Sequence, residues 1–379
     1  MIIVHAGMHK TGSSSIQETF AKLDGNRVDC APWRAANYSA LFFALFHPYP
    51  EEQGGFRFSG IGPDGIEKLR NKWGKRLRQM LERRREQQAT RPMIISAEVV
   101  VSYSRGGEEA VKKMADYLRS HSSEDVCVIA YVRPPRSFIS SAFQQRIKGG
   151  SNLNLANLKV WPDYRWRFKK LDRIFGRENV TLKPFQRERL EGGDVVLDFA
   201  REIGITLDPG EVVRTNESLS LEAVAMLYVQ TWFGDRFEPG TRREAQRRRS
   251  FVNRISRLGS RRFVLSDNLT NPLVEANRTD LDWMEARLDA PLSEPPVPEG
   301  EGIGSEAELI AAALAARPLV EDRIAQLVAG LPAHEIPDYD SSALGVPDAD
   351  RPVYELARRL DFLKGPAQAP APKEAEEKR

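Results

Sequence analysis

The chain has 379 residues, of which 29% are charged and 41% are hydrophobic, and its formal net charge is +3. This length allows a sizeable core, in one large α/β domain or two smaller ones. The small net charge gives no reason to expect a nucleic-acid partner, no apolar run is long enough to span a bilayer, and Cys30 and Cys127 do not make a disulfide framework.

The first twenty residues predict a strand, a turn bounded by glycines, and a helix. Met1–Ala6 is a short apolar run with β-branched residues, typical of a buried strand. Gly7–Gly12 forms the turn, and Ser13–Phe20 begins the helix. At such a junction the N–H groups of the first helical turn and the helix dipole favour an anion. The two glycines keep the spacing of the phosphate loop G-x-x-x-x-G-K-[ST], but Ser13 replaces its lysine and the turn carries Lys10 instead.

This turn resembles the 5′-phosphosulfate-binding loop of the sulfotransferases, enzymes that use 3′-phosphoadenosine 5′-phosphosulfate (PAPS). The family's loop runs Pro-Lys-Ser/Thr-Gly-Ser/Thr-Ser/Thr, and this chain has His9-Lys10-Thr11-Gly12-Ser13-Ser14, with His9 in place of the proline. The resemblance implies that Lys10 lies at the bridging oxygen of the sulfate and that the loop holds the 5′-phosphate. The binding residues expected on this ground are Lys10, Thr11, Gly12, Ser13, Ser14 and Ser15.

Residues 21–90 leave two questions open. The segment Cys30–Pro50 is rich in aromatic residues, which either pack in the core or line an acceptor pocket, and Tyr38–Phe46 within it predicts a short buried helix. Gly65–Thr90 predicts a long amphipathic helix. Its polar face, which includes Arg83, Arg84 and Arg85, is either solvated or a basic rim that attracts an anionic substrate.

A second short strand is predicted at Met93–Ser96, and it leads into Glu98. Because strand ends face the ligand in open parallel sheets, Glu98 is our leading candidate for a catalytic base. The alternative is that Glu98 caps or orients a neighbouring element. Glu108–Ser120 then predicts an amphipathic helix that returns the chain to the next strand.

The stretch after Val126–Val132, a third predicted strand, tests the resemblance. Pro134 and Pro135 suit a helix start, because the first helical turn needs no proline N–H. In the sulfotransferases an arginine at a strand end and a serine eight residues later bind the 3′-phosphate of the nucleotide. Arg133 and Ser141 match that spacing, and a guanidinium offers a fork of donors to a phosphate.

The second half of the chain continues the alternation of strands and helices. We predict a strand at 180–183 and helices at 163–175, 194–203, from about 219 to 232, and at 305–331 with an interruption at Pro318. The arginine-rich segment Arg242–Arg262 is a solvated face, a substitute for the family's C-terminal phosphate-binding segment, or a contact for an acidic acceptor. The predicted domains are a sulfotransferase domain at 1–290, a C-terminal helical extension at 291–363, and a disordered tail at 364–379.

Strands that alternate with helices predict an α/β fold, with a parallel β-sheet flanked by helices in a P-loop-like arrangement. The resemblance implies transfer of a sulfuryl group from PAPS to a hydroxyl acceptor, with a carbohydrate or glycolipid as the suggested acceptor. It implies in-line displacement, no metal, and a base at Glu98 or, as the second candidate, His9. The five histidines show no ligand-like spacing, and a cytoplasmic enzyme is the simplest interpretation.

Two other functions stay open on the sequence. A small-molecule kinase that uses ATP and Mg²⁺ predicts a lysine directly after Gly12, where the chain has Ser13. A non-catalytic protein that binds anionic polymers predicts salt-sensitive binding that does not depend on Lys10.

Overall fold

The computed structural model describes residues 1–8, 10–30, 36–53, 55–56, 60–102, 105–215, 218–237, 241–329, 339, 342 and 345–365. His9 and the predicted tail from residue 366 onward lie outside these ranges. The chain divides into two compact units. Unit 1 comprises Met1–Phe143, Asn157–Ser218 and Val264–Gly304, and unit 2 comprises Gln144–Ala156, Leu219–Phe263 and Ser305–Arg379. These units differ from the predicted limits at 290 and 363, and the predicted division into a sulfotransferase domain, a C-terminal helical extension and a tail stays a prediction.

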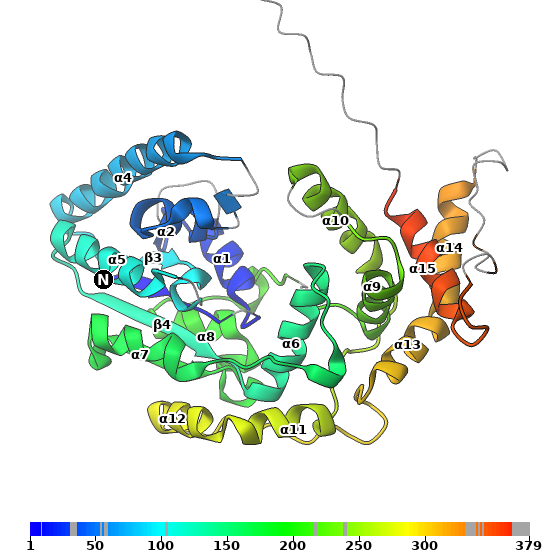
Figure 1. The fold of residues 1–379 in the computed structure, drawn as a ribbon. Coiled ribbons are helices and arrows are strands. Elements are labelled where there is room, and N and C mark those ends of the chain that lie inside the picture. Colours follow the sequence, from blue (N-terminus) through cyan, green and yellow to red (C-terminus); the bar gives the residue numbers. More distant parts are fainter. Residues whose placement is uncertain are drawn as a thin grey trace, which may run out of the picture. The chain divides into compact units, whose positions relative to one another are not determined.

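Unit 1 is built on a five-stranded sheet with the strand order β2-β3-β1-β4-β5. Figure 1 labels β3 and β4 of this sheet. Every pair of neighbouring strands is parallel, as the alternation of elements predicted. The strands are β1 (Ile2–His5), β2 (Asp29–Cys30), β3 (Met93–Ser96), β4 (Val126–Val132) and β5 (Val180–Pro184).

The first strand, β1, lies in the centre of the sheet. His5, its last residue, pairs with Ser96 at the end of β3 on one side and with Ile129 of β4 on the other. The loops that follow β1, β3 and β4 therefore leave from the same edge of the sheet. In parallel sheets this edge is the one that binds ligands.

The strands β1 and β3 are buried along their whole length, which is typical of a parallel sheet covered on both faces. Helix α1 packs with α8, whereas α5 packs with α7 and both contact β4. The helices of unit 1 are α1 (Ser13–Lys22), α2 (Ser39–Phe46), α4 (Pro63–Glu86), α5 (Gly107–His121), α6 (Pro135–Lys148, which ends in unit 2), α7 (Tyr164–Phe175), α8 (Val195–Glu202), α11 (Asp267–Ala276) and α12 (Arg278–Leu288).

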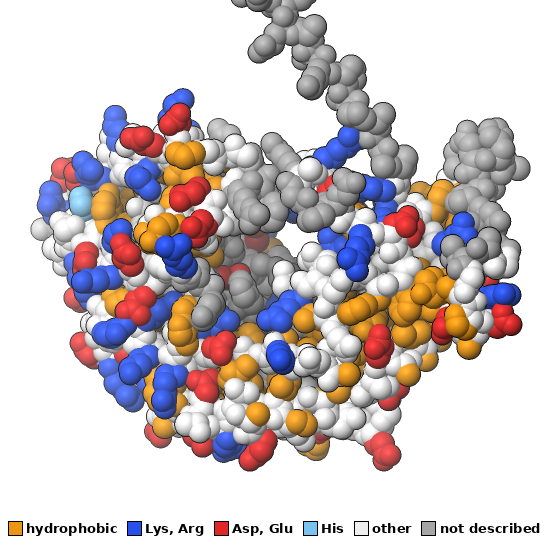
Figure 2. All heavy atoms as spheres, in the orientation of Figure 1, with side chains coloured by type: hydrophobic (Ala, Val, Ile, Leu, Met, Phe, Trp, Pro, Cys, Tyr) orange, Lys and Arg blue, Asp and Glu red, His pale blue; other side chains and the backbone are white. Residues whose placement is uncertain are grey.

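Arg84 of α4 is not part of a basic rim. Its side chain is 4% exposed and donates hydrogen bonds to the carboxylates of Asp29 and Glu124 and to the carbonyl of Arg91. Figure 2 shows lysines and arginines mixed with aspartates and glutamates over α4 and α5. One arginine of α4 is therefore buried in the core, and the surface of the helix carries charges of both signs. This favours the interpretation that its polar face is solvated.

Unit 2 is a helical unit around α9 (Leu221–Phe233), which contacts α10, α13 and α15. Its other helices are α10 (Arg242–Ile255), α13 (Glu306–Ala315), α14 (Arg317–Val328) and α15 (Arg351–Leu363). The predicted interruption at Pro318 is confirmed, since α13 ends before it and the proline lies in the first turn of α14.

The arginines of α10 have a role that the sequence did not suggest. Arg248 donates to the carbonyls of Ile147 and Lys148 at the end of α6, at 2.6 and 2.8 Å. Arg254 donates to the carbonyl of Leu363 at the end of α15, at 2.6 Å. Cations at helix C-termini satisfy the last carbonyls and oppose the helix dipole. These two arginines therefore stabilise helix ends within unit 2.

Among the described residues, no helix combines the length and the apolar character needed to cross a membrane.

Candidate functional site

The loop between β1 and α1 ends in a helix N-terminus that opens toward the ligand-binding edge of the sheet. Gly12 is the N-cap of α1 and has φ 76°, a left-handed conformation that favours glycine. Because Gly12 has no side chain, it cannot cap the first N–H groups of α1 itself. A helix start of this kind is suited to an anion.

Three polar atoms converge on Gly7, the first residue of the loop. A Cβ atom at this position would lie 2.5 Å from Ser13 Oγ, 3.1 Å from Thr11 Oγ1 and 3.1 Å from His5 Nε2. Ser13 Oγ and His5 Nε2 are buried and have no hydrogen-bond partner within the described part of the chain. We call these three atoms the loop cluster. Thr11 Oγ1 donates to the Met8 carbonyl at 2.8 Å. Because buried polar atoms left without partners are costly, the other two atoms of the loop cluster suit an oxygen-rich ligand such as a phosphate.

Substituting Gly12 with alanine should damage this loop. The new Cβ would have to adopt a left-handed backbone and would lie 2.5 Å from Val195 Cγ1, in the first turn of α8. We expect a loss of at least about 2 kcal/mol of unfolding free energy, from backbone strain and overpacking together. Urea unfolding measures it.

Gly25→Ala is the matched control, because Gly25 has φ 75° but nothing within 4 Å of the position of a Cβ. It should show the backbone cost of about 1–2 kcal/mol alone. Equal destabilisation by both variants would contradict the close contact between the loop and α8.

Lys10 lies in the loop in an unusual backbone conformation. It is half-buried, and its φ is 66°, in the left-handed region that non-glycine residues seldom adopt. Its carbonyl accepts a hydrogen bond from Arg133 Nη1 at 2.5 Å. A strained residue held by a specific partner is typical of functional sites.

Arg133 follows the last residue of β4 and lies against the loop between β1 and α1. Besides its bond to the Lys10 carbonyl, its Nε donates to Ser137 Oγ at 3.2 Å. Its guanidinium lies 5.9 Å from the centre of the Phe185 ring. Tyr164 donates its hydroxyl proton to the Arg133 carbonyl at 2.7 Å. Arg133, from the motif that follows β4, thus contacts the loop that carries Lys10.

Ser141, the other predicted contact of the 3′-phosphate, lies on α6 about two turns from its start. The side chain is buried, at 8% exposure. Arg133 contacts the loop between β1 and α1 directly, whereas Ser141 lies on α6, the helix that follows Arg133.

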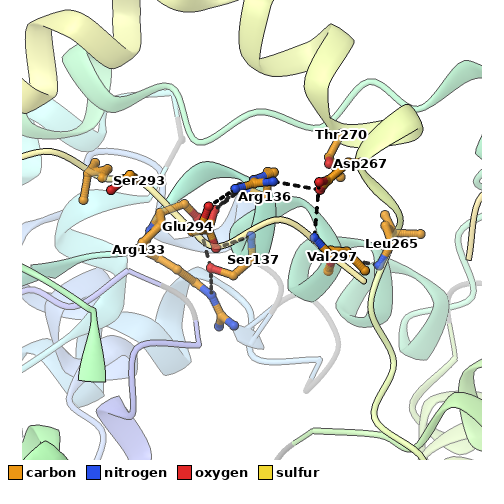
Figure 3. A network of polar contacts seen from close by, with 12 residues as sticks. Arg133, Arg136, Ser137, Leu265, Asp267, Thr270, Ser293, Glu294 and Val297 are labelled. Carbon is orange, nitrogen blue, oxygen red and sulfur yellow. Dashed lines mark hydrogen bonds and ion pairs between the residues drawn. The ribbon is translucent and has the colours of Figure 1, made fainter. Parts of the chain in front are cut away.

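The start of α6 is held by a segment from much later in the chain (Figure 3). The two carboxylate oxygens of Glu294 accept hydrogen bonds from the backbone N–H groups of Arg136 and Ser137, at 2.8 and 2.9 Å. Arg136 in turn pairs with Asp267 at 2.8 Å. The segment Pro291–Gly304 therefore acts as a strap that caps the start of α6 and holds Ser137, which contacts Arg133.

Glu98 lies directly after β3 and opens a short 3-10 helix, Glu98–Val101. It is half-buried. The preceding Ala97 donates its N–H to the carbonyl of His5 at 3.0 Å, so Glu98 is attached to the end of β1. Burial lowers the pKa of His5 to about 4, and the negative charge of the Glu98 carboxylate partly opposes that shift. Glu98, the candidate base, is therefore on the same edge of the sheet as the loop between β1 and α1.

Two of the predicted site residues are not seen in the loop between β1 and α1: Ser15 contacts another segment, and His9 is outside the described residues. Ser15 uses its hydroxyl to bond with Thr215 Oγ1 at 3.1 Å and to accept from the Thr215 N–H at 3.2 Å. Its contacts tie α1 to a later segment of unit 1. His9, the second candidate base, lies outside the described residues. Ser14 is half-buried in the first turn of α1.

The sequence reasoning missed His5, and with it Ser96 and Gln17. Nδ1 of His5 lies 2.7 Å from Ser96 Oγ, and Gln17 Nε2 donates to the same oxygen at 3.1 Å. The signal was present in the sequence, because His5 is a polar residue at the end of an otherwise apolar strand, directly before the loop. Within the described residues there is no group of three or more side chains suited to a metal ion.

No protein-family model matches the chain, and no curated protein matches it. Among solved structures, it is similar to a sulfotransferase from Alicyclobacillus acidocaldarius, with 15% sequence identity and a TM-score of 0.41 over 76% of this chain and 95% of that chain. The functional interpretation depends on the geometry of the site.

Proposed function

We propose that the chain is a sulfotransferase that moves the sulfuryl group of PAPS to a hydroxyl acceptor. The observation that carries the proposal is the hydrogen bond between Arg133, after β4, and the loop between β1 and α1. The loop has an uncapped helix start and a cluster of buried polar atoms, and Arg133 is bonded to it through the Lys10 carbonyl. A nucleotide with phosphates at both the 5′ and the 3′ position needs two anion sites close to each other.

In this proposal the 5′-phosphate lies at the start of α1, where backbone N–H groups and the hydroxyls of Thr11 and Ser13 bind it. Arg133 and Ser141 bind the 3′-phosphate. The bidentate geometry of a guanidinium suits a dianionic phosphate, and this contact would distinguish PAPS from donors that lack a 3′-phosphate.

The chemical step is an in-line displacement at sulfur. The acceptor oxygen forms a bond to sulfur while the bond from sulfur to the oxygen of the 5′-phosphate breaks, and adenosine 3′,5′-bisphosphate leaves. The acceptor proton passes to Glu98, our candidate base. Lys10 stabilises the negative charge that develops on the departing oxygen. As in phosphoryl transfer, the protein contributes mainly positioning and electrostatics.

The test is calorimetric titration of adenosine 3′,5′-bisphosphate and of 5′-AMP against the wild type and Arg133→Ala. We expect Arg133→Ala to bind the bisphosphate about 10–100-fold more weakly, since a hydrogen bond to a charged group contributes about 1.5–3 kcal/mol. The affinity for 5′-AMP should change little.

The second nucleotide separates two roles of Arg133. Because Arg133 also holds the loop, a damaged loop would weaken both nucleotides equally, and that result would contradict a contact with the 3′-phosphate. The control is Arg177→Ala. Arg177 is exposed and lies just before β5, at the opposite edge of the sheet, so its loss should leave both affinities unchanged.

A further inference from the structure

His5 is a buried histidine with one ring nitrogen engaged and the other directed at the loop. The residue is 0% exposed. Its Nε2 has no partner in the described part of the chain, and it lies 3.1 Å from the point where a Cβ of Gly7 would be. Ser13 Oγ, also without a partner there, lies 2.5 Å from the same point. Two unpartnered polar atoms thus lie close to Gly7, at a point where a side chain would clash with Ser13.

The residues behind His5 decide which nitrogen carries the proton. Ser96 Oγ accepts from Gln17 Nε2 at 3.1 Å and lies 2.7 Å from His5 Nδ1, and we assign the serine's own proton to this second hydrogen bond. With Nδ1 accepting, the proton of a neutral imidazole is on Nε2. The nitrogen that faces the loop is then a hydrogen-bond donor.

The rest of the environment keeps the ring neutral and fixed. The ring centre of Phe199 lies 5.1 Å from that of His5, and Tyr131 packs against it edge-on at 6.4 Å. Burial lowers the pKa of His5 to about 4, although the charge of Glu98 acts in the opposite direction. At neutral pH the ring therefore offers one oriented donor and no net charge.

We propose that His5 is a further residue of the anion site, and that its Nε2–H donates a hydrogen bond to an oxygen of the 5′-phosphate held by the loop. This rests on the proposed function for the identity of the ligand. The role of Ser96 and Gln17 is to position the ring. In this assignment the glycine at position 7 serves to let the ligand approach His5 and Ser13.

The test compares His5→Phe and His5→Gln by calorimetric titration. Phenylalanine fills the volume but has no donor, whereas the amide nitrogen of glutamine can replace Nε2–H. The probes are adenosine 3′,5′-bisphosphate and 3′-AMP, which lacks the 5′-phosphate. We expect His5→Phe to bind the bisphosphate about tenfold more weakly and 3′-AMP with unchanged affinity. His5→Gln should recover most of the loss.

His47→Phe is the matched control, because His47 is also buried, at 2% exposure, and its Nε2 also lacks a partner among the described residues. It follows α2 rather than a strand. It should leave both affinities unchanged. If His5→Phe binds the bisphosphate as tightly as the wild type, or loses both nucleotides equally, the donor role is overturned.

Two further arms keep the proposal testable. If His5→Phe does not fold, Ser96→Ala replaces it, with a severalfold loss of affinity for the bisphosphate alone expected and no loss overturning the proposal. If the wild type does not bind the bisphosphate, the proposed function fails, and titration with inorganic pyrophosphate decides about His5. Weaker pyrophosphate binding by His5→Phe supports the donor, whereas equal binding, or none by the wild type, overturns it.

Discussion

Replacing Lys10 with methionine is expected to slow sulfuryl transfer from PAPS by about 10²–10³-fold, the usual cost of removing one group that stabilises charge in the transition state. Methionine keeps an unbranched side chain of nearly the same length and removes the charge. It also keeps a Cβ at a position with φ 66°, so the backbone strain at Lys10 is the same in both proteins. The loss should therefore appear in the rate rather than in the fold.

The measurement is release of adenosine 3′,5′-bisphosphate from PAPS under single-turnover conditions, with the acceptor that gives the fastest release in the wild type. Lys22→Met is the control, because Lys22 is exposed in the last turn of α1. It should release the bisphosphate at the wild-type rate. An unchanged rate in Lys10→Met would contradict a role for the lysine at the departing oxygen.

The second large effect concerns stability. Arg84→Ala is expected to lower the free energy of unfolding by about 3–5 kcal/mol, because it removes the partner of buried carboxylates. Arg84 donates to Glu124 Oε1 and Oε2 at 2.9 and 2.7 Å and also pairs with Asp29. Although burial acts to raise the pKa of Glu124, the hydrogen bonds and charge of Arg84 help to hold that pKa below its usual value. Without Arg84, both carboxylates lose their buried partner, and among the described residues only the more exposed Arg91 at Asp29 and the N-terminal amine at Glu124 are left to pair with them.

Urea unfolding of Arg84→Ala and Arg85→Ala measures this difference. Arg85 is the next residue of α4 and is exposed, so its loss should change the unfolding free energy by less than about 0.5 kcal/mol. If the two variants are equally stable, Arg84 is a surface residue in solution and the buried ion-pair network does not form.

The sequence predicted the fold of unit 1 well where local pattern and tertiary burial agree. The apolar runs at β1, β3 and β4 are buried strands, and the glycine turn after β1 is followed by a helix as expected. It did not predict β2, Asp29–Cys30, because two residues are too few to show a period. It also did not predict α11, which carries Pro272 inside the helix.

For the candidate site, the sequence suggested two motifs but not the contact between them. Spacing identified Lys10 and Arg133, but no local pattern could show that Arg133 bonds to the Lys10 carbonyl across 123 positions of sequence. The strap at Glu294 is more distant still, 158 positions from Arg136. Side-chain contacts of this range are decided by tertiary packing, which a single sequence does not reveal.

The arginine-rich segments show that a sequence can also suggest a binding role for residues that the structure uses for stability. On the sequence, Arg84 and Arg248 are members of basic runs that suggest an anionic partner. In the structure, Arg84 is buried among carboxylates, and Arg248 donates to the last carbonyls of α6, where burial lowers its pKa to about 10. Charge density along a chain does not distinguish a binding surface from structural ion pairs and helix caps.

The measurement that tests the central claim most directly is the ratio of the dissociation constants of 5′-AMP and adenosine 3′,5′-bisphosphate for the wild-type chain, with ATP and Mg²⁺ as a third ligand. We predict that the bisphosphate binds at least tenfold more tightly than 5′-AMP and more tightly than ATP with Mg²⁺, because Arg133 supplies a second anion site beside the loop. Equal binding of the bisphosphate and 5′-AMP, or tighter binding of ATP that depends on Mg²⁺, would contradict a sulfotransferase and favour a kinase.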